Sequence, residues 1–109
     1  MLPKNRAPAH PGQILKNRFL APLGLSQREA ASLLGLSQHR TINELCTGKR
    51  SVSPHMALIL AKAFGTSPDL WLNLQHNYDL WHVQRERSTH ARLAKVQSIT
   101  LPQHALASA

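Results

Sequence analysis

The sequence predicts an all-α fold, a compact five-helix bundle followed by a short C-terminal extension. Apolar residues recur at helical spacing in several segments, whereas no stretch alternates apolar and polar residues convincingly enough to be a strand. Serine, proline and glycine mark where most of these segments begin and end. At 109 residues the chain is long enough to form one domain with its own core.

The first predicted helix covers about residues 12–20. Leu15, Phe19 and Leu23 follow one another at intervals of four, which places them on one apolar face. A proline and a glycine near residue 23 mark the end of this helix.

The second helix begins with a capping box. Ser26 is its N-cap, Glu29 stands three residues later, and Gly35 closes the helix. The residues that we expect to point inward are Ala30, Leu33 and Leu34.

A third helix follows almost at once, and its faces differ. Ser37 is in position to cap it, and it ends before Gly48. Because successive residues turn by about 100°, one stripe is buried and consists of Ile42, Leu45 and Cys46. The opposite face consists of Arg40, Asn43, Glu44 and Thr47, with Thr41 and His39 on its flanks. This pattern of two helices around a tight turn indicates a helix-turn-helix motif at about residues 26–47.

The fourth and fifth helices both open with Ser-Pro. Ser53 and Pro54 begin a helix that stops at Gly65, and because it is apolar almost all round we expect it to be the buried centre. The fifth helix covers about residues 67–87, and a short further helix near residues 90–96 fits the remaining sequence.

The fifth helix carries more apolar surface than one core face of a small bundle uses. This surplus favours dimerisation, and the alternative is that the helix packs between the bundle and the tail. The predicted dimer stripe consists of Trp71, Leu74, Tyr78 and Trp81.

Positive charge is concentrated in the N-terminal half of the chain. The formal net charge is +8, and residues 1–50 hold eight of the 13 basic side chains but only two of the five acidic ones. This imbalance indicates a polyanionic partner, with nucleic acid first. The alternative is a solvated surface that keeps a small protein soluble.

The outer face of the third helix fits the major groove of double-stranded DNA. Arg40 can present two donors to guanine and Gln38 or Asn43 can pair with adenine, each contact discriminating by ~1–3 kcal/mol. Arg28 at the start of the second helix and Lys49 after the third suit phosphates. The predicted DNA-binding residues are Gln27, Arg28, Ser37, Gln38, His39, Arg40, Thr41, Asn43, Thr47, Lys49 and Arg50.

Arg40 also has a simpler interpretation. It stands four residues before Glu44, so the two side chains can form a solvated ion pair that contributes only ~0.3–0.5 kcal/mol. Both roles are compatible, because Glu44 can orient the guanidinium group.

Three segments carry a family resemblance: "LGLSQREAASLLGLS", "INEL" and "GKRSVSPHMALILAKAFGTSPDLWLNLQHNYDL". Together they resemble the HigA/VapI-type antitoxins of type II toxin-antitoxin systems, members of the Cro/CI-type (XRE) helix-turn-helix superfamily. The match covers about residues 11–80, and "GTSPDLWLNLQ" is its most specific part. The resemblance implies a dimeric repressor that binds its own operator and neutralises a HigB/RelE-type mRNA-cleaving toxin.

The sequence departs from the family pattern by one residue. Gly35 and Gly48 are thirteen positions apart, where the family usually has twelve. An insertion inside the helix would rotate one part against the other by about 100°, so we place the extra residue before Ile42, as a longer turn or a later cap. The helix then begins after Ser37.

Two other classes of protein compete with this interpretation: an enzyme and an RNA-binding module. His76, Asp79 and His82 stand three apart, but that spacing spreads them across about 120° of a helix, too wide for a compact metal site. The sequence has no zinc-finger spacing, phosphate loop or carboxylate cluster, so we expect no catalytic residue, metal or cofactor. An RNA-binding module is disfavoured because no exposed aromatic platform is evident. A stand-alone XRE-family repressor without a toxin remains the alternative.

The domain boundaries follow from these assignments. We expect a flexible arm at residues 1–10, a DNA-binding and dimerisation domain at residues 11–87, and a partly disordered extension at residues 88–109. Cys46 has no partner for an intramolecular disulfide and lies on an apolar stripe, so it is a core residue. Without an apparent signal peptide or membrane span, we expect a cytoplasmic protein.

Overall fold

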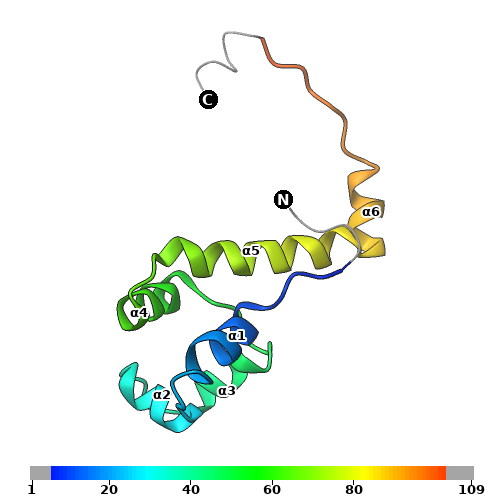
Figure 1. The fold of residues 1–109 in the computed structure, drawn as a ribbon. Helices are drawn as coiled ribbons and strands as arrows, with labels where there is room; N and C mark the ends of the chain where they lie inside the picture. The colour runs from blue at the N-terminus through cyan, green and yellow to red at the C-terminus, as the bar shows by residue number, and fades with distance from the viewer. Residues whose placement is uncertain (1–5, 103–109) are drawn as a thin grey trace.

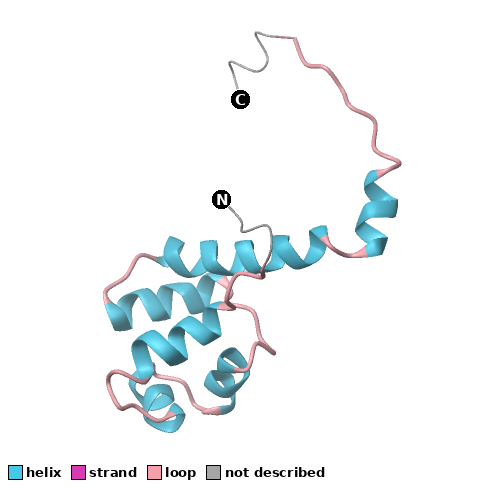
Figure 2. Cartoon of the chain, turned by 45° about the vertical axis from the view of Figure 1, so that its right-hand side comes forward, coloured by secondary structure: helices cyan, strands magenta, loops and turns pink. Residues whose placement is uncertain are grey.

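Helices joined by turns make up the computed structural model, which describes residues 6–102 (Figures 1 and 2). The elements follow in this order: α1 (Pro11–Ile14), η1 (Leu15–Leu20), α2 (Gln27–Leu33), α3 (Arg40–Cys46), α4 (Pro54–Phe64), α5 (Pro68–Gln84) and α6 (Arg87–Leu93). α1 runs directly into η1, a wider π-helical stretch, so the two form the first predicted helix. No strand occurs within residues 6–102, which confirms the all-α prediction. α6 lies beyond the predicted bundle of five and begins three residues before the short further helix expected near residues 90–96.

The core lies where the first helix meets α3, α4 and α5. α1 packs against both α3 and α5, α2 packs against α3, and α4 packs against α5. Figure 1 shows α2 and α3 at the lower end of the molecule, while α6 turns away from the far end of α5. The largest fully buried side chains are Trp71, Leu15, Ile42, Leu45, Leu60 and Pro11.

Three of the predicted serine caps are confirmed. The Ser26 hydroxyl accepts the Glu29 backbone N–H at 3.0 Å, and the Glu29 carboxylate accepts the Ser26 N–H at 3.1 Å, which completes the capping box. The hydroxyls of Ser53 and Ser67 likewise accept a backbone N–H at the start of α4 and α5, without the reciprocal bond, and each serine has a proline directly after it. Local sequence therefore sets the beginnings of α2, α4 and α5.

The predicted cap of the third helix is wrong. α3 begins at Arg40, with His39 before it and no side chain capping its first turn. Ser37 stands three residues before the first helical residue, too far for its hydroxyl to reach the free N–H groups of that turn. The connection after Gly35 is correspondingly longer, in agreement with an extra residue placed before Ile42.

Two leucines that the helical patterns place inside are exposed. Leu23 is 62% exposed because η1 ends at Leu20 and residues 21–24 form a turn. Leu33 is 71% exposed because Ala30 and Ala31 define the buried face of α2.

Leu58 shows that α4 is not buried all round. Its side chain is 60% exposed, because Met56, Ala57 and Leu60 turn the buried face of the helix the other way. The apolar character of a helix therefore predicted more burial than α4 has.

Trp71 belongs to the core of its own chain. Its side chain is 0% exposed, its indole N–H donates to the Thr66 hydroxyl at 2.8 Å, and its ring lies 5.2 Å from that of Phe19. Its place in the predicted dimer stripe is therefore wrong, because it has no surface to offer a second chain. The other three members, Leu74, Tyr78 and Trp81, are half-buried.

Gln75 ties α5 to the connection between α3 and α4. Its buried side-chain oxygen accepts the backbone N–H of Val52 at 2.8 Å, while its amide nitrogen donates to the Asp79 carboxylate at 2.9 Å. The segment that leaves α3 is therefore anchored to the longest helix.

The structure does not follow either predicted domain boundary. His10, assigned to the flexible arm, is buried and caps α1, so it belongs to the bundle. α6 crosses the predicted boundary between residues 87 and 88. The rest of the predicted arm, residues 1–5, and the end of the extension, residues 103–109, lie outside the described residues.

Candidate DNA-binding surface

Two helices are joined at the predicted DNA-reading surface. The Asn43 side-chain amide on α3 donates to the Gln27 side-chain oxygen at the start of α2, at 3.1 Å. This contact fixes the outer face of α3 relative to the N-terminus of α2.

The two faces of α3 are divided as predicted. Ile42 and Leu45 are 0% exposed and Cys46 is 6% exposed, and burial raises the pKa of the Cys46 thiol. Arg40 and Asn43 are exposed, and Thr41 is half-buried. Because the inner stripe holds the helix to the core, its polar outer face is presented to solvent.

Glu44 lies between two arginines. Its carboxylate is 2.8 Å from Arg50 Nη2 and 3.8 Å from Arg40 Nε, and the Arg50 hydrogen bond lowers the pKa of Glu44. The Arg40 side chain is 79% exposed, so the predicted ion pair is present only as a long contact. Arg50 is held beside the end of α3, whereas Arg40 extends from its first turn.

The residues before α3 do not lie on the helix. Ser37 and Gln38 belong to the connection from α2, and His39 is the residue just before the first turn; all three are exposed. The prediction that Gln38 and His39 occupy the first helical turn is therefore wrong. They precede the N-terminal end of α3 in the chain.

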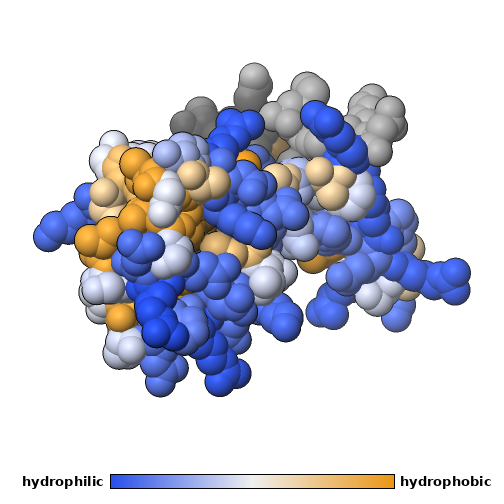
Figure 3. Space-filling model, turned by 60° about the horizontal axis from the view of Figure 1, so that its bottom comes forward, coloured by the Kyte–Doolittle hydropathy of each residue, from blue (hydrophilic) through white to orange (hydrophobic). Residues whose placement is uncertain are grey.

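The remaining predicted residues differ in how they are engaged. The Thr47 hydroxyl donates to the backbone carbonyls of Asn43, at 2.8 Å, and Glu44, at 3.3 Å, so its proton is already used. Arg28 and Lys49 are exposed. Figure 3, which brings the lower end of Figure 1 forward, shows hydrophilic side chains over much of this face and an apolar area on one side.

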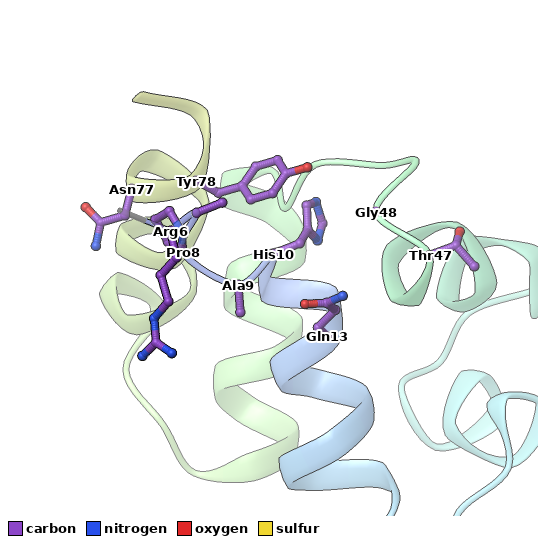
Figure 4. A pocket seen from close by; sticks show the side chains of 10 residues that line it. Arg6, Pro8, Ala9, His10, Gln13, Thr47, Gly48, Asn77 and Tyr78 are labelled. Atoms are coloured by element: carbon purple, nitrogen blue, oxygen red, sulfur yellow. The ribbon is translucent and has the colours of Figure 1, made fainter. Parts of the chain in front are cut away.

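A hollow of about 730 Å³ lies behind the end of α3, between residues 6–10, α1 and α5 (Figure 4). His10 lines it: its Nδ1 accepts the Gly12 N–H at 2.9 Å, and its ring meets that of Tyr78 edge-on at 4.8 Å. Burial lowers the pKa of His10, and the negative charge of Asp79 partly opposes this. The neutral imidazole is therefore the form that caps α1.

Gly12 explains how closely α1 approaches α3. A Cβ atom at this position would lie 1.5 Å from the Leu45 carbonyl oxygen, so a larger residue would force the two backbones apart. The start of α1 thus fixes the C-terminal end of the DNA-reading helix. Within residues 6–102, no group of three histidine, cysteine or acidic side chains is placed to hold a metal ion.

Two contacts of this surface were missed from the sequence. The Gln27–Asn43 hydrogen bond joins residues sixteen apart, and the Arg50–Glu44 contact joins residues six apart across a helix end. Neither spacing corresponds to neighbours on one helix, so helical periodicity carries no signal for them.

Comparisons with known proteins agree with this geometry. A family model described as helix-turn-helix matches residues 15–71. The HTH-type transcriptional regulator YbaQ of Escherichia coli K12 is 37% identical over 94 residues, which cover 86% of this chain and 82% of the relative. Antitoxin HigA-1 of Vibrio cholerae is 34% identical over 100 residues, which cover 92% and 93%. The solved structure of antitoxin GraA in complex with its operator has a TM-score of 0.79 at 32% identity, covering 93% and 100% of the two chains.

The chain belongs to the helix-turn-helix family of DNA-binding regulators, and it is not an enzyme. Within that family its relatives and structural neighbours assign it to the HigA antitoxin type of the XRE superfamily. No helix in the described part of the chain is long and apolar enough to span a bilayer.

Proposed function

We propose that this chain is a sequence-specific DNA-binding antitoxin that represses its own operon as a dimer and neutralises an mRNA-cleaving toxin of the HigB/RelE type. The observation that carries the DNA-binding part is the outer face of α3, where exposed Arg40 and Asn43 adjoin the N-terminus of α2 through Gln27. The operator complex of GraA supports the same use of the fold.

The geometry supports a division of labour on DNA. With α3 in the major groove, the Arg40 guanidinium donates to guanine O6 and N7, and Asn43 reads an adenine while Gln27 holds it in place. The free N–H groups at the start of α2, together with Arg28 and Lys49, contact phosphates and set the register.

Repression as a dimer follows from the symmetry of operators. Helix-turn-helix proteins bind paired half-sites through two copies, and each copy of this chain offers one α3. The toxin part of the proposal is supported by similarity to HigA-1, which is named an antitoxin. The adjacent gene is therefore expected to encode a small basic nuclease.

Co-expression with the product of the adjacent gene, followed by footprinting, tests the proposal. We expect the two products to co-purify, growth arrest by the neighbour alone to be relieved by this chain, and protection of a site upstream of both genes. Lack of relief with protection retained would support the second candidate, a stand-alone repressor, which the similarity to the regulator YbaQ favours. Lack of protection would contradict both.

A further inference from the structure

An apolar groove lies between α2 and α4. It consists of two adjoining hollows, of about 270 Å³ and about 440 Å³, and both are lined by Leu33, Leu34 and Ala63. Phe64 also lines the smaller hollow, and Lys62 lines the larger one. We call these two hollows, with the exposed leucines in and beside them, the α2–α4 groove.

Three leucines of the α2–α4 groove are open to solvent. Leu23, Leu33 and Leu58 are each 60% or more exposed. Leu23 and Leu33 line the smaller hollow, and Leu58 lies one helical turn before Lys62 on α4. Together the three side chains expose roughly 350 Å², which is the size of apolar patch that marks a binding site.

The groove has the shape of a protein-binding site. Figure 3 shows apolar side chains gathered on the left of the molecule, where α2 and α4 lie in Figure 1. The smaller hollow has room for a large apolar side chain of a partner, and buried anchors of this kind supply most of the binding energy of an interface.

The groove is almost free of charge in a chain whose formal net charge is +8. Among the described residues, Lys62 is the only charged one that lines either hollow. The other exposed surfaces are basic. Arg40, Lys49 and Arg50 lie on or after α3, and residues 79–96 hold four basic side chains against two acidic ones, a net charge of +2.

The charge of the toxin selects this surface. A nuclease that cleaves mRNA binds a polyanion, so its own surface is basic. Two basic proteins repel each other least where one presents an uncharged apolar face. We propose that the toxin docks in the α2–α4 groove, with one of its apolar side chains filling the smaller hollow. This inference rests on the proposed function and gives its toxin a place on the chain.

The groove is distinct from the predicted base contacts. Leu33 is the last residue of α2, whereas Gln27, which accepts the hydrogen bond from Asn43, is the first. Leu58 belongs to α4, which lies outside the helix-turn-helix pair. Substitutions of these two leucines therefore leave the DNA-reading side chains in place.

Calorimetric titration of the purified full chain with the purified product of the adjacent gene tests the docking site. We expect wild type to bind, and the double variant Leu33→Lys, Leu58→Lys to bind at least ~100-fold more weakly, because it places two charges in an apolar contact. Neither leucine belongs to the buried core, so circular dichroism, thermal unfolding and operator affinity are expected to be unchanged.

The matched control is Asn73→Lys, Asn77→Lys. It adds the same two charges at exposed positions of α5, and it is expected to bind the toxin as wild type does. An equal loss in this control would overturn the inference, because added charge alone would then weaken binding.

Two further outcomes would overturn the inference and leave the proposed function standing. One is a leucine variant that binds the toxin as tightly as wild type does. The other is unchanged toxin binding together with the loss, by sedimentation velocity, of a larger assembly that wild type forms, which would assign the groove to a second copy of this chain. A wild type that does not bind the toxin at all contradicts the antitoxin function itself.

Discussion

At the residue scale, the two arginines beside Glu44 are held to different degrees. Arg50 is tied to the carboxylate at 2.8 Å, while Arg40 makes only a 3.8 Å contact and is largely exposed. The tied side chain loses little further freedom when it meets a phosphate, and the exposed one can reach a base edge.

Replacing Arg40 by alanine is expected to weaken operator binding by ~1–3 kcal/mol, the value of one bidentate base contact, and to relax specificity at one operator position. Competition titrations against operators substituted one base pair at a time measure this. Arg92→Ala on α6 is the control, with no expected change. An equal loss on unrelated DNA would show that Arg40 contacts only the backbone.

His10 makes folding sensitive to acid. The pKa of His10 is lowered from 6.5 by burial, so the unfolded chain binds the proton more tightly than the folded one. The stabilisation is complete above pH 6.5 and is lost as the pH falls toward the folded-state pKa. Protonation also removes the acceptor that Nδ1 offers to Gly12.

The His10→Asn variant tests this contribution, because asparagine can cap a helix but does not titrate. Wild type is expected to lose more thermal stability than the variant between pH 7 and pH 5. Differential scanning calorimetry at both pH values gives the comparison. Equal losses would mean that another group causes the acid sensitivity.

At the element scale, α3 is held at its C-terminal end and on its outer face by different contacts. Gly12 of α1 packs on its C-terminal end, and the hydrogen bond from Asn43 to Gln27 holds its outer face to α2. Lys49 is exposed and stands three residues after the end of this helix.

Replacing Lys49 by alanine is expected to weaken binding to all DNA sequences and to reduce the slope of log affinity against log salt by about 1. Fluorescence anisotropy over a range of salt concentrations measures the slope. Lys95→Ala, at the opposite end of the molecule, is expected to leave it unchanged. An unaltered slope for Lys49→Ala would remove this residue from the phosphate contacts.

The element scale also shows what sequence could predict. The starts of three helices were predicted correctly from Ser26, Ser53 and Ser67, because a cap is a local interaction between residues three apart. Leu33 and Leu58 were predicted inside because periodicity finds an apolar face but does not say which neighbours cover it. The start of α3 was predicted too early because a serine in position to cap does not ensure that the backbone turns there.

For the candidate site, the faces of α3 were predicted correctly but two of its side-chain contacts were not. The buried stripe and outer face of α3 follow from 100° per residue and are confirmed by the burial of Ile42 and Leu45. The partners of Asn43 and Arg50 depend on how α2 crosses α3 and on how the chain leaves α3. Those are tertiary properties, and no single helix encodes them.

At the scale of the whole molecule, the helix-turn-helix pair lies far from the last helix. α2 and α3 form one end, and α6 forms the other (Figure 1). A dimer that keeps both α3 helices accessible is expected to protect two half-sites about one helical turn, ~34 Å, apart. Hydroxyl-radical footprinting gives this spacing, and a single protected half-site would exclude the two-fold arrangement.

The buried hydrogen bond between Gln75 and Val52 also allows a motion of the molecule to be measured. The Val52 amide proton is covered by a side chain of α5, so it exchanges with solvent only when α5 releases the segment that follows the DNA-reading helix. Its exchange rate therefore reports how often the contact between α5 and the segment after α3 opens, and this can be measured without any bound partner.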